Sequence, residues 1–208
     1  MSITKKPSPP KAARRTRRSP EAARANILAA AQALLLEKGP QALKLTDVAA
    51  RAGIAHATVL HHFGTIADVH AALMERMIGD LVGQIQAAHA QSGKGGMPDE
   101  TLPATGAPLL FDAFEQTGAA RLAAWLELTG EARRHTLVRD AVRSVLAGRK
   151  DRSPGRDSEG ELAAAYDRVL LSIVLAVGVG LFGRSLAEAL GRPPGRAREL
   201  AQQLLKGE

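Results

Sequence analysis

The sequence predicts an all-α protein in three parts, and composition, periodicity and punctuation all support this. Hydrophobic residues make up 45% of the 208 residues but aromatics only 3%, so the core must be built from Leu, Val, Ile and Ala. Leu and Ala favour helix, and no alternating Val/Ile/Thr run demands a strand. Apolar residues recur at helical spacing between Gly- and Pro-rich breaks. We expect an arm at 1–18, a three-helix unit at 19–65 and a larger helical body at 66–208.

The first helix has clear start and stop signals. Ser19-Pro20-Glu21 supplies a cap, a proline at the first helical position and an acidic residue in the first turn, and Gly39-Pro40 ends the helix. A later start signal, Thr65 to Asp68, fits a capping box and opens a long helix that we expect to run to about His89.

Residues 43–63 predict two short helices joined by a tight turn. The first is expected to start at Thr46, whose hydroxyl can cap free backbone N–H groups, and Gly53 can take the left-handed conformation that ends it. A second helix follows from His56, with Val59 and Phe63 on its buried side. Two short helices set at an angle by a glycine turn are the arrangement with which a helix-turn-helix presents its second helix to a DNA major groove.

The charge distribution favours the same interpretation. The chain has 28 basic and 21 acidic residues, and its whole excess of +7 lies in the first 18 residues, before the first acidic residue, Glu21. The basic residues of the arm are Lys5, Lys6, Lys11, Arg14, Arg15, Arg17 and Arg18. A basic arm next to a helix-turn-helix suits phosphate contacts or minor-groove entry. The alternative is that residues 1–18 are only a solubilising tail. The prolines of the arm predict that it is disordered when it is not bound to DNA.

The body is expected to contain four further helices. Helical patterning covers 108–130, with a break at Thr117-Gly118, and then 131–146, 161–190 and 196–206. The helix at 161–190 is apolar around most of its circumference, so we expect it to be buried on several sides. One side can be a second subunit, with Gly178 and Gly180 permitting close contact, or the helix can be the central core of a monomer. Its most apolar run, 169–182, is too short to span a bilayer.

These elements, in this order, resemble the tetracycline-repressor (TetR) family. The matching residues, within about 20–75, are Ile27-Leu28-Ala29-Ala30-Ala31, Glu37-Lys38-Gly39, Asp47-Val48-Ala49, Arg51-Ala52-Gly53-Ile54, Thr58 and His62-Phe63. The resemblance implies a homodimer through the last two helices and a ligand pocket in the C-terminal body. It also implies repression at a palindromic operator that ligand relieves. An alternative is a DNA-binding or architectural protein of the same fold that senses no small molecule.

Three positions depart from the family pattern. Ala55 stands where a serine usually caps the second short helix, Leu60 where a tyrosine usually touches phosphate, and Ile66 where a lysine usually reaches phosphate. Each departure removes a backbone anchor of about 1 kcal/mol. The arm and the histidines can compensate, or the operator is bound weakly, or the chain has lost DNA binding.

The candidate site residues follow from position. We expect His56, Thr58 and His61 near base edges or phosphates, Ala57 close to a thymine methyl, and Lys44 and Thr46 near the opposite phosphates. His62 is a further candidate, although packing under the helix is the more ordinary role. Candidates for lining a ligand pocket are the large or polar-tipped side chains of the body: Phe111, Phe114, Trp125, His135 and Tyr166. The alternative for these aromatics is that they fill core.

Other classes of function find little support. The chain has no cysteine, and adjacent His61 and His62 point about 100° apart on a helix and cannot chelate together, so we expect no metal and no cofactor. No phosphate loop or isolated carboxylate pair indicates an enzyme, because Asp112/Glu115 and Glu127/Glu131 are typical of solvated faces. The apolar stretch at 27–36 is interrupted by Gln32 and is not typical of a secretory signal. We therefore expect a cytoplasmic protein.

Overall fold

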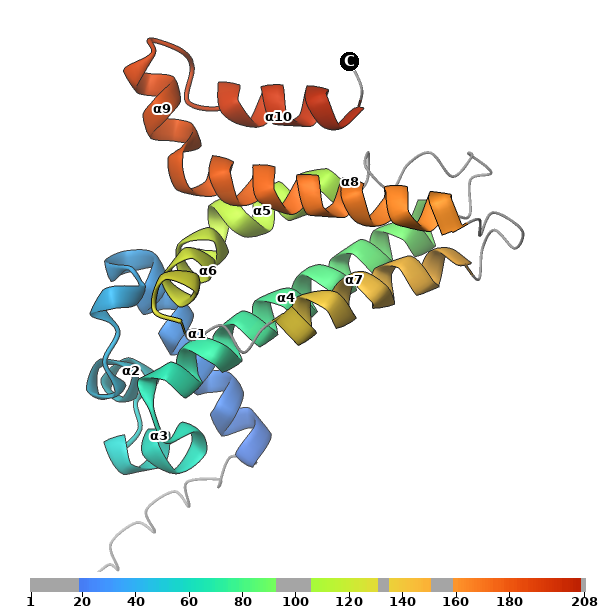
Figure 1. Ribbon diagram of the computed structural model, residues 1–208. Coiled ribbons are helices and arrows are strands. Elements are labelled where there is room, and N and C mark those ends of the chain that lie inside the picture. The colour runs from blue at the N-terminus through green and yellow to red at the C-terminus, as the bar shows by residue number, and fades with distance from the viewer. Residues whose placement is uncertain (1–18, 93–105, 131–134, 151–158, 207–208) are drawn as a thin grey trace, which may run out of the picture.

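The computed structural model describes residues 19–92, 106–130, 135–150 and 159–206, and within these ranges it contains helices and no strand (Figure 1). The all-α prediction is confirmed. The helices are α1 Pro20–Lys38, α2 Leu45–Ala52, α3 His56–Phe63, α4 Ile66–Ser92, α5 Ala107–Gln116, α6 Ala119–Leu128, α7 His135–Lys150, α8 Glu159–Gly178, α9 Arg184–Ala189 and α10 Arg196–Lys206. A 3₁₀ turn, Pro40–Ala42, follows α1, and a π-helical segment, Val179–Gly183, joins α8 to α9.

The helix ends are set by the side chains that the sequence indicated. The Ser19 hydroxyl accepts a hydrogen bond from the Ala22 N–H at 3.2 Å and caps α1. At the start of α4, the Thr65 hydroxyl accepts from the Asp68 N–H at 3.1 Å, and the Asp68 carboxylate accepts from the Thr65 N–H at 3.0 Å. This reciprocal pair is the predicted capping box, and it satisfies two donors that the first turn would otherwise leave open.

The predicted start of α2 at Thr46 is wrong. The helix begins at Leu45 and its N-cap is Lys44, whose carbonyl accepts from the N–H groups of Asp47 and Val48 at 3.1 and 3.0 Å. Leu45 packs against the buried apolar residues of the neighbouring helices, so the helix already includes residue 45. Thr46 is then an exposed residue of its first turn. No side chain caps α2.

The helix of 108–130 is broken where the sequence indicated. Gly118 has φ of 83° and separates α5 from α6, and a Cβ there would lie 3.0 Å from Leu35 on α1. The next helix, α7, is described over His135–Lys150 and so continues past the predicted end at 146, whereas its predicted start at 131 lies outside the described residues.

The largest cluster of buried apolar residues, here called the first core cluster, joins α6 to the N-terminal helices. Its fully buried side chains include Ile27 and Leu35 of α1, Leu73 of α4, and Leu122 and Leu126 of α6. The helix α6 therefore completes the core of the three-helix unit, although it comes more than fifty residues later in the chain. A second, smaller cluster lies between α5, α8 and α10, and Phe114 packs against both.

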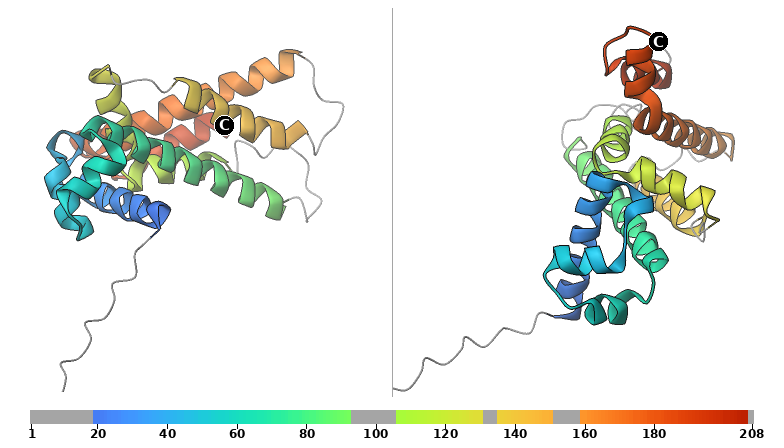
Figure 2. Two further views of the ribbon diagram at one scale, coloured as in Figure 1. Left: turned by 90° about the horizontal axis from the view of Figure 1, so that it is seen from below. Right: turned by 90° about the vertical axis from the view of Figure 1, so that its left-hand side faces the viewer.

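The two ends of the molecule are far apart. In Figures 1 and 2 the α1–α3 unit lies at one end and α9–α10 at the other, with α4 and α7 side by side and α5 against α8 between them. The long helix α4 starts directly after α3 and runs into the body. The helices α4 and α6 thus connect the body to the α1–α3 unit by direct packing.

The helix predicted to be buried on several sides is largely exposed in the single chain. It is continuous over 162–189 and, by length and composition, sufficient to cross a membrane, so it extends well beyond the short apolar run. Only 11% of its most apolar window is buried. Among the described residues, the helices that pack most against it are α5, α6 and α10, and they leave most of its surface uncovered.

Gly178 and Gly180, the two glycines of this helix that the sequence singled out, have different roles. A Cβ on Gly180 would lie 2.9 Å from the Ala120 Cβ and 3.0 Å from the Phe114 carbonyl oxygen, so this glycine allows close packing within the chain. A Cβ on Gly178 would meet nothing within 4 Å. Of the two, Gly178 is therefore the one with space beside it for contact with another molecule.

Candidate nucleic-acid interface

The turn between α2 and α3 is fixed by its backbone. Gly53 has φ of 66°, in the left-handed region that favours glycine, and its N–H donates to the Ala50 carbonyl at 3.2 Å. The Ile54 N–H then donates to the Ala49 carbonyl at 3.1 Å, which returns Ile54 to the core. The helix α3 begins one residue later with Ala55 as a cap that has no side-chain hydrogen bond, so the missing serine is not replaced.

Two polar residues of α1 hold the helix-turn-helix in place. The Asn26 amide donates to the Ala52 carbonyl at the end of α2 at 2.9 Å. The Arg24 guanidinium lies 4.2 Å from the centre of the Phe63 ring and donates to the His62 carbonyl at 3.0 Å. Sequence reasoning missed both residues as positioning groups. The signal for Asn26 was a polar residue next to the apolar face of a helix.

The helix α3 is anchored on one side and open on the other. Val59 and Phe63 are buried in the first core cluster, whereas His56, Ala57, Leu60 and His61 are exposed. Thr58 and His62 are half-buried, and the rings of His61 and His62 meet edge to face with centroids 5.5 Å apart.

The other candidate positions for DNA contact lie as follows. Lys44 and Thr46 are exposed at the start of α2, on the same unit. The arginines at 14, 15, 17 and 18 lie outside the described residues. The structure thus leaves most of the candidate side chains at α2 and α3 exposed to solvent. DNA contact by the arginines of the arm stays a prediction.

Ion pairs neutralise much of the charge on the helix-turn-helix unit. Residues 19–65 contain four basic and three acidic side chains. Lys38 pairs with Asp47 at 3.6 Å, and Arg51 binds the Glu37 carboxylate. The hydrogen bond from Arg51 lowers the pKa of Glu37, and the same contact raises the pKa of Arg51. These pairs tie α2 to α1 and leave little net charge on the unit, so strong attraction to phosphate requires the arm.

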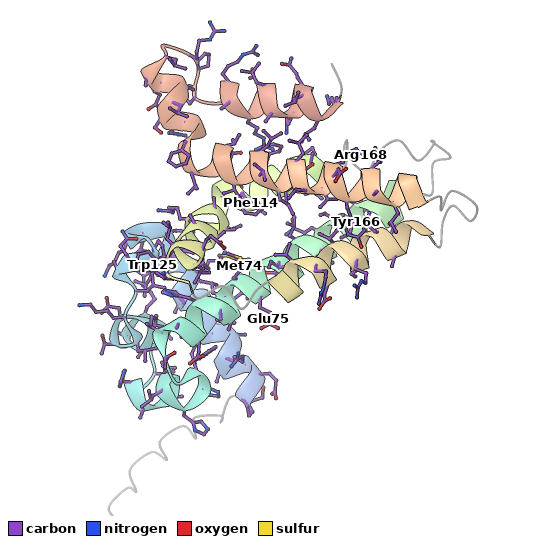
Figure 3. All side chains as sticks on the ribbon, in the orientation of Figure 1. Met74, Glu75, Phe114, Trp125, Tyr166 and Arg168 are labelled. Atoms are coloured by element: carbon purple, nitrogen blue, oxygen red, sulfur yellow. The ribbon has the colours of Figure 1, made fainter. Side chains whose placement is uncertain are left out.

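The candidate ligand residues of the body are not gathered in one place. Phe111 is fully buried in the second cluster, and Phe114 is half-buried between the two clusters. Trp125 lies on α6 next to α4, whereas Tyr166 is partly exposed on α8 at the opposite end of the body (Figure 3). The side chain of His135 lies outside the described residues.

Two buried polar atoms lie near the first core cluster. The Trp125 indole nitrogen and one guanidinium nitrogen of Arg76 are buried without a hydrogen-bond partner among the described residues. Trp125 belongs to α6 and Arg76 to α4, the two helices that reach the N-terminal unit. Sequence reasoning did not single out Arg76.

The carboxylate pair Asp112 and Glu115 has a structural partner. Arg198 of α10 binds the two carboxylates at 2.7 and 2.9 Å and lies 5.9 Å from the centre of the Phe111 ring. Burial by itself lowers the pKa of Arg198, but the hydrogen bonds and charges of both carboxylates outweigh it and raise the pKa. The pair fastens α10 to α5, so it is an ion-paired contact between helices rather than the solvated face that the sequence indicated.

Comparison with known proteins identifies the unit and the fold. Residues 27–73 match the family described as bacterial regulatory proteins, tetR family. A TetR-family transcriptional regulator from Pectobacterium atrosepticum is 18% identical, with 92% of this chain and 94% of that chain covered and a TM-score of 0.63. A tetR-family regulator from Streptomyces coelicolor is 20% identical over 89% of this chain and 78% of that one, with a TM-score of 0.61.

A third solved structure contains a ligand. The TetR-family repressor FadR of Thermus thermophilus, in complex with lauroyl-CoA, is 17% identical over 88% of this chain and 92% of that one, with a TM-score of 0.53. No curated protein matches the chain in sequence.

Proposed function

We propose that this chain, which belongs to the tetR family of bacterial regulatory proteins, is a homodimeric, cytoplasmic repressor that binds a palindromic operator and is released by a small molecule. The observation that carries the proposal is the open side of α3. Its buried side is held by Val59 and Phe63 and its end by Arg24, so its exposed side chains are presented as a fixed surface. A fixed, exposed second helix is what insertion into a major groove requires.

Affinity for DNA is proposed to come mainly from the arm. The helix-turn-helix unit carries little net charge, whereas residues 1–18 carry seven basic residues and no acidic one. Lys44 at the cap of α2 adds a cation on the described surface. In this division of roles the arm neutralises phosphates, and α3 reads bases.

A second copy of the chain is the proposed partner of α8, α9 and α10. Exposed apolar side chains follow one another every four residues along the long helix, with Gly178 at the one position that has none. They are Leu162, Tyr166, Leu170 and Val174, and then Phe182, Leu186 and Leu190. Leu200 and Leu204 of α10 extend this surface. When two helices cross, rows of residues four apart form ridges on one helix that pack into the grooves of the other. The small Gly178 permits close approach at the middle of the row.

The apolar surface supports a dimer rather than a membrane span. Its helix packs against α5, α6 and α10 within the same chain, and Arg168 and Arg184 lie within its length. A second copy buries the exposed row and provides the second α3 that a palindromic site needs. The second core cluster is small, which is consistent with the burial of Leu162–Ala189 against another protein rather than within the chain.

An effector is proposed to act next to α6. The FadR repressor, which has this fold, is seen in complex with lauroyl-CoA, and this supports an effector for the present chain. Here Phe114 and Trp125 remain the best-placed candidates to line such a site. Phe114 is half-buried between the two core clusters, and Trp125 is half-buried against the first cluster with an N–H that has no partner among the described residues. Phe111, His135 and Tyr166 stay candidates from the sequence.

The connection from this site to the DNA surface is short. Arg121 of α6 donates to the Leu36 carbonyl of α1 at 3.3 Å, and Gly118 lies against Leu35. A ligand that displaces α6 thereby moves α1 and, through Arg24 and Asn26, the ends of α2 and α3. A change in the spacing of the two α3 helices in a dimer lowers operator affinity.

In vitro selection tests the proposal. The full chain is incubated with a random duplex pool at near-physiological salt, and the bound DNA is amplified and sequenced over several rounds. We expect enrichment of an inverted repeat with half-sites about one helical turn, or a multiple of it, apart. Enrichment of no sequence over a pool treated without protein contradicts the proposal.

A further inference from the structure

Two apolar side chains form the middle of the open side of α3. Ala57 and Leu60 lie three residues apart on the helix, so their side chains are neighbours on one face, and both are exposed. Leu60 is 48% exposed, although an apolar side chain of this size gains by leaving water. His56 and His61 border this pair on the same open side.

The composition of α3 limits what it can read. Arg, Lys, Asn and Gln make the bidentate hydrogen bonds that distinguish guanine and adenine, and α3 contains none of them. Thr58 is half-buried, and the open surface is apolar at its centre. The apolar group that a major groove offers is the 5-methyl of thymine.

We propose that Leu60, with Ala57 beside it, is a specificity-determining contact that packs on thymine methyl groups in the major groove. This inference rests on the proposed function, because it needs α3 to lie in that groove. Leu60 has no donor for the phosphate that a tyrosine usually contacts at this position, and it lies beside Ala57, which is expected close to a thymine methyl. Each half-site then contains thymine beneath the middle of α3, and its methyl group contributes to the affinity.

Uracil differs from thymine only in lacking the methyl group, so it isolates this contact. The probe is the duplex recovered by selection with the full chain, synthesised once with dT and once with dU at every thymine position. Binding of both duplexes is measured by fluorescence anisotropy at one salt concentration. We expect weaker binding of the dU duplex, by about fourfold for each methyl that is buried, and so about 16-fold when each half-site buries one methyl.

Two leucine variants assign the effect to its residue. Leu60→Ala shortens the exposed side chain and keeps a good helix former, so it is expected to fold and to bind the dT and dU duplexes with nearly equal affinity. Leu128→Ala is the matched control, because Leu128 is an exposed leucine on α6 outside the helix-turn-helix. It is expected to retain the full difference between the two duplexes.

The outcomes separate this inference from the function on which it rests. Selective binding by the wild-type chain with equal affinity for the dT and dU duplexes overturns thymine reading and leaves DNA binding intact. A dU effect that Leu60→Ala retains overturns the assignment to Leu60. Failure of the selection to enrich any sequence overturns the proposed function and this inference together.

Discussion

The replacement Val174→Glu tests whether the apolar row on α8 is a dimer interface. Val174 is 59% exposed in the single chain and precedes Gly178 by one turn in the row. A glutamate there leaves the single chain little affected, because the side chain points into solvent. In a dimer, one glutamate from each copy is buried in the apolar interface that the row forms.

The magnitude follows from the exposed fraction. Burying a whole valine side chain contributes about 1.5–3 kcal/mol, so the exposed part of Val174 contributes about 1–2 kcal/mol in each copy and about 2–4 kcal/mol in the dimer. An unpaired carboxylate costs at least as much again before it is neutralised. A total of about 4 kcal/mol or more raises the dimer dissociation constant by about a thousandfold.

Sedimentation velocity over a range of concentrations measures the effect. We expect the wild-type chain to be dimeric and Val174→Glu to be monomeric at micromolar concentration, with unchanged helical circular dichroism. Leu128→Glu is the control, because Leu128 is 85% exposed but lies on α6, away from the row, and it should remain dimeric. A Val174→Glu chain that dimerises like the wild type refutes the assignment of this surface. Recovery of the wild-type chain in the membrane fraction of lysed cells refutes it as well.

Four further substitutions probe the packing and the ion pairs. Gly180→Ala forces a Cβ into contact with α5 and α6 and is expected to cost about 1–3 kcal/mol by thermal unfolding, whereas Gly178→Ala has open space and should leave the stability of the single chain nearly unchanged. Arg198→Ala removes both carboxylate contacts of α10 and is expected to cost about 1 kcal/mol, seen as a fall of a few degrees in Tm. The pKa of Glu37 is lowered by Arg51, so the contribution of this pair is present above the pKa of Glu37 in the unfolded chain and disappears as pH falls through its lower folded value. Glu37→Gln should therefore reduce the acid sensitivity of stability in urea titrations at pH 7 and pH 3, and an unchanged difference between the two pH values contradicts this origin.

Local signals in the sequence predicted most of the secondary structure. Ser19-Pro20 and Thr65 to Asp68 set helix starts through contacts within one turn, and Gly53 and Gly118 end or break helices through their backbone freedom. Such features need only neighbouring residues. Thr46 was assigned wrongly because the start of α2 depends on the burial of Leu45, which is a tertiary contact.

Features that depend on distant parts of the chain could not be predicted. No local pattern indicates that Leu122 and Leu126 of α6 complete the core of the N-terminal unit. The same holds for Arg198, whose partners lie more than eighty residues away. The exposure of Leu60, by contrast, follows from the local pattern, because the predicted burial of Val59 and Phe63 already fixes which side of α3 is open.

The dependence of DNA affinity on salt tests the central claim most directly. The selected duplex is titrated with the full chain and with a variant in which Arg14, Arg15, Arg17 and Arg18 are alanine, between about 50 and 200 mM salt. We predict selective binding by the full chain with a steep fall in affinity, and a slope of log K against log salt that is shallower in the variant by about 0.9 for each phosphate that the arm no longer neutralises. Binding that is indifferent to sequence, or a slope that the four substitutions leave unchanged, contradicts an arm that holds phosphate while α3 reads the bases.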